Sequence, residues 1–123
     1  MYNPIIVNHF SDSKNVGELS NPDMEIKVGN DVCDDKIIIH LAINDKNEVE
    51  DAKFLAYGCA TSIATGSIFC DYVKGKTLDV IRITNKLTRE KLLGELEPSQ
   101  HHCLNILNDI FEQHTELGEV SND

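Results

Sequence analysis

The chain has four cysteines, Cys33, Cys59, Cys70 and Cys103, and the surroundings of all but Cys70 suggest metal chemistry. Asp35 follows Cys33 by two residues, and His102 directly precedes Cys103. In an extended segment, residues i and i+2 point to the same side, so Cys33 and Asp35 can face one ligand. Thiolate, imidazole and carboxylate groups are the donors that bind zinc and iron–sulfur clusters in proteins. The sequence therefore directs attention to a metal or cluster site.

Three of these cysteines fall where predicted elements begin or end. Cys33 precedes a strand, Cys59 follows a strand and opens a helix, and Cys103 lies in the first turn of the last helix. Helix N-termini favour anions, which lowers the pKa of a thiol placed there. Each cysteine taken alone would more often be a small buried residue, but their joint placement predicts one site. Its candidate ligands are Cys33, Asp35, Cys59, His102 and Cys103.

The ligand set has more donors than a closed tetrahedral site needs. A permanent structural zinc site uses four fixed ligands, whereas exchangeable ligands suit something that is assembled and then released. Cys70 is excluded because it follows Cys59 by eleven residues on one predicted helix. A rise of about 1.5 Å per residue then separates the two by roughly 16 Å. We interpret Cys70 as a small buried core residue.

The composition limits the function classes. A chain of 123 residues with 41% hydrophobic residues suits a single domain, residues 1–123, with its own core. The chain has a formal net charge of -10 and lacks the clustered cations that bind a phosphate backbone. We therefore expect no nucleic-acid binding. Apolar runs are too short for a membrane span, and no secretory signal begins the chain. We therefore expect a cytoplasmic or organelle-matrix protein, a reducing setting in which disulfides are rare.

The first half of the chain predicts one helix and a sheet. Pro4 to Phe10 reads as a helix with Asn3 as its N-cap, because proline suits the first helical position. An irregular connection follows up to Asp23. Three strands come next, with β-branched or alternating patterns: Met24 to Val28, Lys36 to Ile43 and Val49 to Tyr57.

The second half predicts helices. We expect a helix rich in small residues after Gly58, and we expect it to end at Gly75. Its small side chains predict that it packs closely against another element. We expect Thr77 to open a short helix with Leu78, Ile81 and Ile83 facing inward, and Thr88 to cap another. Ser99 is the expected N-cap of an amphipathic last helix, and residues 116–123 are expected to form a flexible acidic tail. Strands followed by helices predict an α+β fold: a small three-stranded antiparallel sheet with helices packed on one side.

Several short segments, taken in order, resemble a known family. They are Asn15-Val16-Gly17, Val32-Cys33-Asp34-Asp35, Glu50-Asp51-Ala52-Lys53-Phe54, Tyr57-Gly58-Cys59, Val73-Lys74-Gly75-Lys76-Thr77-Leu78 and His102-Cys103. Together they resemble the IscU/NifU-type iron–sulfur cluster assembly scaffolds, over about Tyr2 to Phe111. Each fragment alone is weak, but the ordered set is specific.

The resemblance implies a scaffold rather than an enzyme. It implies that Cys33, Asp35, Cys59, His102 and Cys103 surround a transient [2Fe-2S] cluster, and that zinc occupies the same site in isolated protein. Cys103 is the implied acceptor of persulfide sulfur from a cysteine desulfurase, and Asp35 is implied to keep the cluster labile. Apo iron–sulfur proteins are the implied recipients, with a ferredoxin and a frataxin-like protein as further partners.

Two departures from the family pattern stand out. The family usually has Cys-Gly-Asp, but here Asp34 occupies the middle position, and its charge beside Cys33 is expected to alter cluster lifetime. Bacterial members commonly carry Leu-Pro-Pro-Val-Lys before the His-Cys pair, which an Hsp70-type chaperone grips. Leu96-Glu97-Pro98-Ser99-Gln100 stands there instead, which argues against chaperone-assisted delivery.

Three other functions compete with the scaffold. A zinc-dependent sulfurtransferase relative would accept persulfide sulfur without building a cluster, but such relatives carry a longer insertion than the 44-residue step from Cys59 to Cys103. A structural zinc-binding module would bind zinc tightly and would show no response to a cysteine desulfurase. A Cys–His hydrolase fits least, since adjacent helical residues point about 100° apart and cannot readily pair as nucleophile and base.

Overall fold

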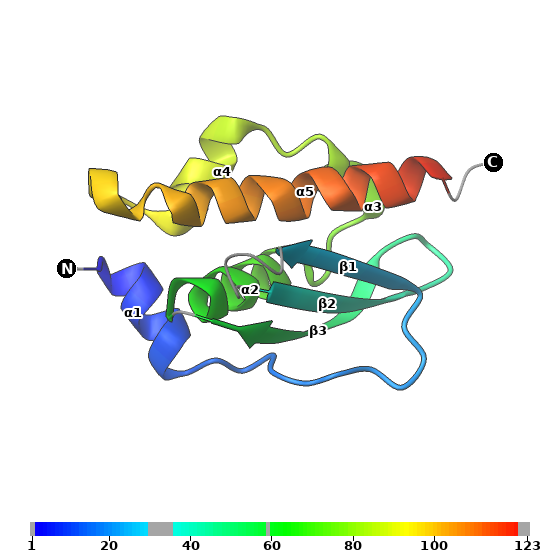
Figure 1. Ribbon diagram of the computed structural model, residues 1–123. Helices are drawn as coiled ribbons and strands as arrows, with labels where there is room; N and C mark the ends of the chain where they lie inside the picture. Colours follow the sequence, from blue (N-terminus) through cyan, green and yellow to red (C-terminus); the bar gives the residue numbers. More distant parts are fainter. Residues whose placement is uncertain (1, 30–35, 59, 121–123) are drawn as a thin grey trace.

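A three-stranded antiparallel sheet organises the molecule. In the computed structural model, which describes residues 2–29, 36–58 and 60–120 (side chains as far as 115), the strands pair in the order β1-β2-β3. They are β1 (Met24–Gly29), β2 (Lys36–Ile43) and β3 (Val49–Tyr57) (Figure 1). All three strands confirm the sequence prediction, and so does the antiparallel pairing.

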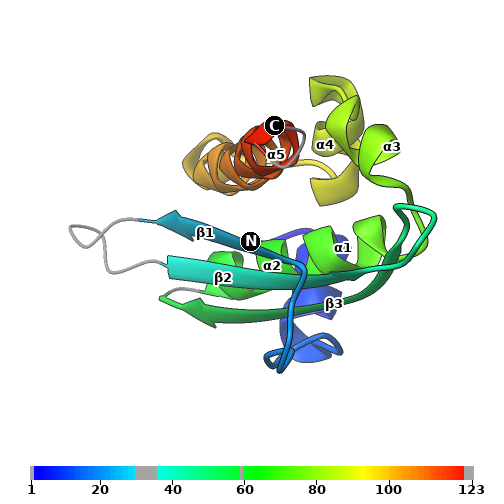
Figure 2. The same ribbon diagram turned by 90° about the vertical axis from the view of Figure 1, so that its right-hand side faces the viewer.

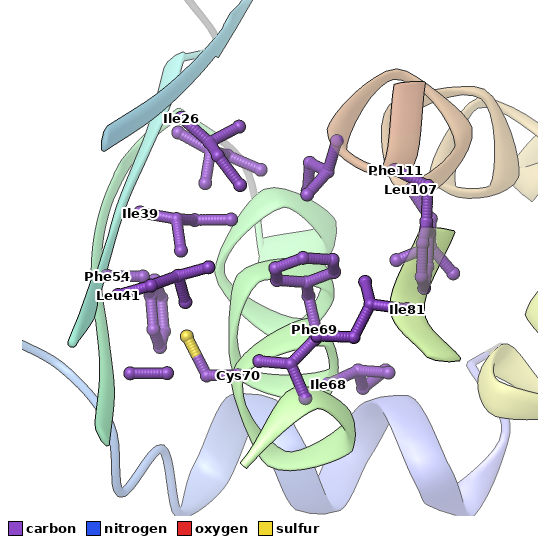
Figure 3. Packing of buried hydrophobic residues seen from close by; sticks show 14 of the residues in the cluster. Ile26, Ile39, Leu41, Phe54, Ile68, Phe69, Cys70, Ile81, Leu107 and Phe111 are labelled. Atoms are coloured by element: carbon purple, nitrogen blue, oxygen red, sulfur yellow. The ribbon is translucent and has the colours of Figure 1, made fainter. Parts of the chain in front are cut away.

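The helices pack on one face of this sheet. They are α1 (Pro4–Ser11), α2 (Ala60–Val73), α3 (Leu78–Arg82), α4 (Lys86–Leu93) and α5 (His102–Val120), with a 3-10 helix η1 (Pro98–Gln100) before α5. Figure 3 shows α2 between the sheet and α5, with α1 alongside α2. In Figure 2, α3, α4 and α5 lie together on one side of the sheet. The α+β class with helices on one side is therefore confirmed.

Strand alternation puts the apolar residues against these helices. Ile37, Ile39 and Leu41 of β2 are buried, as are Ile26 of β1 and Phe54 of β3. With a period of two residues, these side chains share the sheet face that α2 and α5 cover. Phe69 of α2 stacks edge-on against Phe111 of α5, with centroids 5.1 Å apart, which closes the core between the two helices.

The segment between α1 and β1 lines the open edge of β3. Gly17 N donates to Phe54 O at 2.9 Å, and Phe54 N donates to Asn15 O at 2.9 Å. His40 ties the same segment to the sheet: its Nδ1 accepts from Leu19 N at 3.1 Å. The opposite ring nitrogen, Nε2, lies 2.9 Å from a Glu25 carboxylate oxygen, and this hydrogen bond lowers the pKa of Glu25. His40 is therefore a structural residue.

The small residues of α2 let the helix approach the sheet closely. A Cβ atom placed on Gly66 would lie 2.6 Å from Cδ2 of Phe54, well inside van der Waals contact. The neighbouring side chains on this helix are also small and buried: Thr61, Ser62, Ala64, Thr65 and Ser67. This contact confirms the expectation that the helix after Gly58 packs closely against another element.

The predicted helix caps are confirmed at two positions. Asn3 caps α1, since its side chain accepts from Ile6 N at 3.0 Å. Thr77 caps α3 by accepting from Val80 N at 3.3 Å. In both cases the side-chain oxygen accepts a backbone N–H that has no partner within the helix.

Other predicted helix boundaries are wrong. Ile83 is 78% exposed because α3 ends at Arg82 and Ile83 is its C-cap. Thr88 does not cap α4: Asn85 does, by accepting from Thr88 N at 2.9 Å, so the helix starts earlier. Ser99 lies inside η1 instead of capping α5.

The last helix also differs from prediction at its start. It begins at His102, after η1, because Glu97 and Gln100 close a capping box around η1. It continues to Val120, and the flexible tail expected at residues 116–123 stays a prediction. No helix within the described ranges is both long and apolar enough to cross a membrane.

Replacing Gly66 by alanine should destabilise the fold. Alanine normally stabilises a helix interior by about 1 kcal/mol over glycine. Here the added methyl group meets the Phe54 ring, so we expect the free energy of unfolding to fall by about 1–3 kcal/mol. Urea denaturation of wild type and Gly66→Ala measures it, and Phe54→Leu in the Gly66→Ala background should recover part of the loss. A Gly66→Ala protein as stable as wild type would contradict the close contact.

His114 should make stability depend on pH. It is fully buried, neither ring nitrogen has a partner among the described residues, and burial, with the charge of Arg82, lowers its pKa from 6.5 to about 4. Below pH 6.5 the unfolded chain gains a proton there that the folded protein does not take up, so stability is full above 6.5 and falls toward pH 4.

Between pH 7.5 and 5 this group should lower the free energy of unfolding by about 2 kcal/mol. The pH dependence in urea denaturation should be smaller by that amount in His114→Leu, since the other titrating groups are common to both proteins. An identical dependence in the two proteins would show that His114 titrates normally when folded.

Candidate functional site

Strand pairing brings together the described residues that flank two of the predicted ligand segments. Gly29, at the end of β1, pairs with Lys36, at the start of β2. Lys36 in turn pairs with Tyr57, at the end of β3. The residues bordering positions 30–35 and the residues before position 59 are therefore neighbours at one end of the sheet.

The first turns of α2 and α5 meet through a hydrogen bond. Thr61 Oγ1 and His102 Nε2 are 3.1 Å apart. Thr61 is the second residue of α2 and is fully buried, whereas His102 is the first residue of α5 and is exposed. This contact places His102 at the start of α2.

Cys103 lies in the first turn of α5, as the sequence predicts. Its side chain is 0% exposed and belongs to the main core cluster, together with Leu107 and Phe111. In this conformation solvent does not reach the thiol. A reaction of Cys103 with another protein therefore requires a change that exposes the thiol.

Three of the five predicted ligands, Cys33, Asp35 and Cys59, lie outside the described residues. Convergence of the five on one site thus stays a prediction. Among the residues that are described, no three histidine, cysteine or acidic side chains are close enough to hold a metal ion.

Cys70 is a core residue, as predicted. It is 0% exposed and points from α2 toward the sheet (Figure 3). Burial raises the pKa of its thiol to about 12. A thiol that stays protonated at neutral pH is a poor nucleophile and a poor metal ligand.

The sequence does not reveal the long-range hydrogen bonds of two residues, Thr61 and Asn3. Thr61 gives no signal beyond its hydroxyl group in the first turn of a helix. Asn3 is recognisable as an N-cap, but its long-range contacts are not: its amide donates to Leu93 O and to Glu95 O, each at 2.7 Å. Asn3 therefore fastens α1 to the connection between α4 and η1.

The segment before His102 has its own local structure. Glu97 N donates to Gln100 Oε1 at 3.3 Å, and Gln100 is buried. The reciprocal pair closes η1, which leads directly into α5. The departure from the family pattern at Leu96 to Gln100 thus coincides with a capped turn.

Comparison with known proteins places this arrangement in a family. The NifU-like N terminal domain matches residues 1–116. The chain belongs to this family. Among its relatives, "Iron-sulfur cluster assembly scaffold protein IscU 1" of Archaeoglobus fulgidus is 38% identical over 114 residues, which cover 92% of this chain and 73% of the relative. The IscU scaffold protein of Escherichia coli strain K12 is 35% identical over 115 residues, covering 90% and 88%.

Solved structures of the NifU-like type share the fold. A NifU-like protein of Brucella abortus superposes with a TM-score of 0.60 at 20% identity, covering 93% of this chain and 80% of its own. A putative iron–sulfur cluster assembly scaffold of Fervidobacterium islandicum gives a TM-score of 0.61 at 21% identity, covering 87% and 82%. These structures show the shared fold, and the family match together with the two scaffold relatives confirms the predicted resemblance.

Substitution of Asn3 tests the link between α1 and the segment before η1. Asn3→Asp keeps an oxygen that can cap α1 but removes the donors to Leu93 O and Glu95 O. We expect a loss of about 1–3 kcal/mol in the free energy of unfolding, because the two carbonyl groups lose their donor and face a carboxylate oxygen instead. Asn3→Ala also loses the cap, which is worth about 1 kcal/mol, but it places no charge against these carbonyl groups.

Urea denaturation of both variants gives these values. If Asn3→Asp is as stable as wild type while Asn3→Ala is not, the cap alone matters and the long-range hydrogen bonds contribute nothing.

Proposed function

We propose that this protein is a scaffold on which iron–sulfur clusters are assembled and from which they are passed to apo-proteins. The observation that carries the proposal is the identity of 35–38%, over at least 90% of the chain, with relatives named as cluster assembly scaffolds. The cluster is the cargo of such a protein, so it acts as a scaffold rather than an enzyme.

The proposed ligands are Cys33, Asp35, Cys59, His102 and Cys103. Support comes from described neighbours: Lys36 pairs with Tyr57, and Thr61 bonds His102, so the segments that precede and follow the ligand positions meet at one end of the fold. The donor chemistry fits, since soft thiolates bind the irons of a [2Fe-2S] cluster or zinc. One carboxylate among thiolates gives a harder, weaker bond, which suits later release.

We propose that Cys103 accepts the sulfur. Its thiolate attacks the outer sulfur of a persulfide on a cysteine desulfurase, a new S–S bond forms at Cys103, and the desulfurase thiolate leaves. Reduction of that persulfide to sulfide consumes two electrons, which a ferredoxin supplies in this scheme. Because Cys103 is buried in the described conformation, docking of the desulfurase must expose its thiol.

Further partners follow from the same proposal. A frataxin-like protein would regulate iron, and apo iron–sulfur proteins would receive the cluster. An Hsp70-type chaperone is not included, because the segment from Leu96 to Gln100 lacks the family's usual motif and forms the capped turn η1.

Anaerobic reconstitution tests the proposal. Purified protein is mixed with ferrous iron, cysteine and a cysteine desulfurase, and visible absorption is followed. We expect sulfur-to-iron charge-transfer bands in wild type and their loss in Cys33→Ala, Cys59→Ala and Cys103→Ala. Cys70→Ala is the matched control: it also removes one thiol, but one buried in the core, and should keep the bands.

Other outcomes would contradict the scaffold. Stimulation of the desulfurase without absorption bands would favour a zinc-dependent sulfurtransferase. Tight stoichiometric zinc with no response to the desulfurase would favour a structural zinc-binding module. Loss of the bands in Cys70→Ala, in a protein that is still folded, would refute the proposed ligand set.

A further inference from the structure

The hydrogen bond between Thr61 and His102 joins a buried side chain, that of Thr61, to an exposed one, that of His102. Thr61 is fully buried in the first turn of α2, and its β-branched side chain has few rotamers. His102 begins α5 and is exposed, so its ring would otherwise sample several orientations. The 3.1 Å contact between Oγ1 and Nε2 restrains that ring from the buried side.

Only one direction of this hydrogen bond leaves the histidine able to bind a metal. If the hydroxyl donated to Nε2 of a neutral ring, the ring proton would sit on Nδ1, and neither nitrogen would keep an available lone pair. If Nε2–H donates to Oγ1, the lone pair on Nδ1 stays available. Histidines that bind metals generally donate their other ring N–H to a nearby acceptor, which sets the tautomer and the ring orientation.

We propose that Thr61 is a positioning residue for His102: its Oγ1 accepts from Nε2–H, holds the ring, and reserves Nδ1 for iron or zinc. This inference rests on the proposed function, in which His102 is a ligand. A threonine hydroxyl can accept this bond while donating its own proton elsewhere, so the role is compatible with other contacts of Thr61.

His40 provides an internal reference for the tautomer. Its Nδ1 accepts from Leu19 N at 3.1 Å and its Nε2 lies 2.9 Å from a carboxylate oxygen of Glu25. A backbone N–H can only donate, so the proton of neutral His40 must be on Nε2. His40 belongs to the sheet and has no part in the proposed site, so its signals should be the same in every variant below.

The first experiment reads the hydrogen bond directly in the metal-free full-length protein. Histidine ring nitrogens are observed by NMR at a pH of about 8, where imidazoles are in general neutral, and His102→Ala assigns the signals. We expect the His102 proton on Nε2, exchanging with water on the order of tenfold more slowly in wild type and Thr61→Ser than in Thr61→Val. A proton on Nδ1 in wild type, or equal exchange in Thr61→Val, would overturn the proposal.

The second experiment measures zinc affinity by competition with a chelator. Thr61→Val should weaken binding by about 10- to 100-fold, the usual effect of losing a partner of a ligating histidine. Thr61→Ser, which restores the hydroxyl, should bind about as tightly as wild type. In a His102→Ala background, Thr61→Val should cause no further loss, since Thr61 acts through His102. An equal loss with and without His102 would mean that Thr61 acts through the fold, which overturns the proposal.

The two proposals fail in different ways. Unchanged zinc affinity in His102→Ala would overturn the proposed ligand set and the positioning role with it. Weakened affinity in His102→Ala together with unchanged affinity in Thr61→Val would overturn only the role of Thr61. Where Thr61→Val does not fold, Thr61→Ala gives the same comparison without the extra methyl groups.

Discussion

The close approach of α2 to the sheet is the constraint on which the rest of the structure depends. Gly66 leaves room for the Phe54 ring, and the small buried residues around it keep the helix near the strands. Because α2 lies between the sheet and α5, its position also sets where α5 can pack, through Phe69 against Phe111. The meeting of Thr61 with His102 at the start of both helices is a consequence of that packing.

The fold could be predicted from the sequence where a regular period or a local cap decided the structure. The alternation in the three strands, Asn3 before Pro4 and the small residues after Gly58 each identify an element by a local rule. The failures occurred where two local signals competed. Asn85 and Thr88 could both cap a helix, and η1 separates Pro98 from the start of α5, a boundary set by the reciprocal hydrogen bonding of Glu97 and Gln100.

For the site, the sequence offers only candidate residue types, and the convergence of the five ligands stays a prediction. Cysteines at element boundaries, with Asp35 and His102 nearby, indicate metal chemistry, but the sequence holds no sign that Thr61 would meet a residue forty-one positions away. The contacts of Asn3 with Leu93 O and Glu95 O are long-range in the same sense. Such contacts depend on how the helices pack against one another, and a local pattern of apolar residues does not predict that packing.

The burial of Cys103 bears on how a scaffold could work. A thiol in the core is protected from oxidation, but it must be exposed before it can attack a persulfide. The start of α5 follows η1, and the connection before η1 is fastened to α1 by the Asn3 amide. A partner that displaces α1 would therefore remove the two hydrogen bonds that Asn3 donates to Leu93 O and Glu95 O, shortly before η1. The N-terminal helix is thereby linked to the segment that leads into Cys103, which we propose as the sulfur acceptor, although the two lie far apart in the sequence.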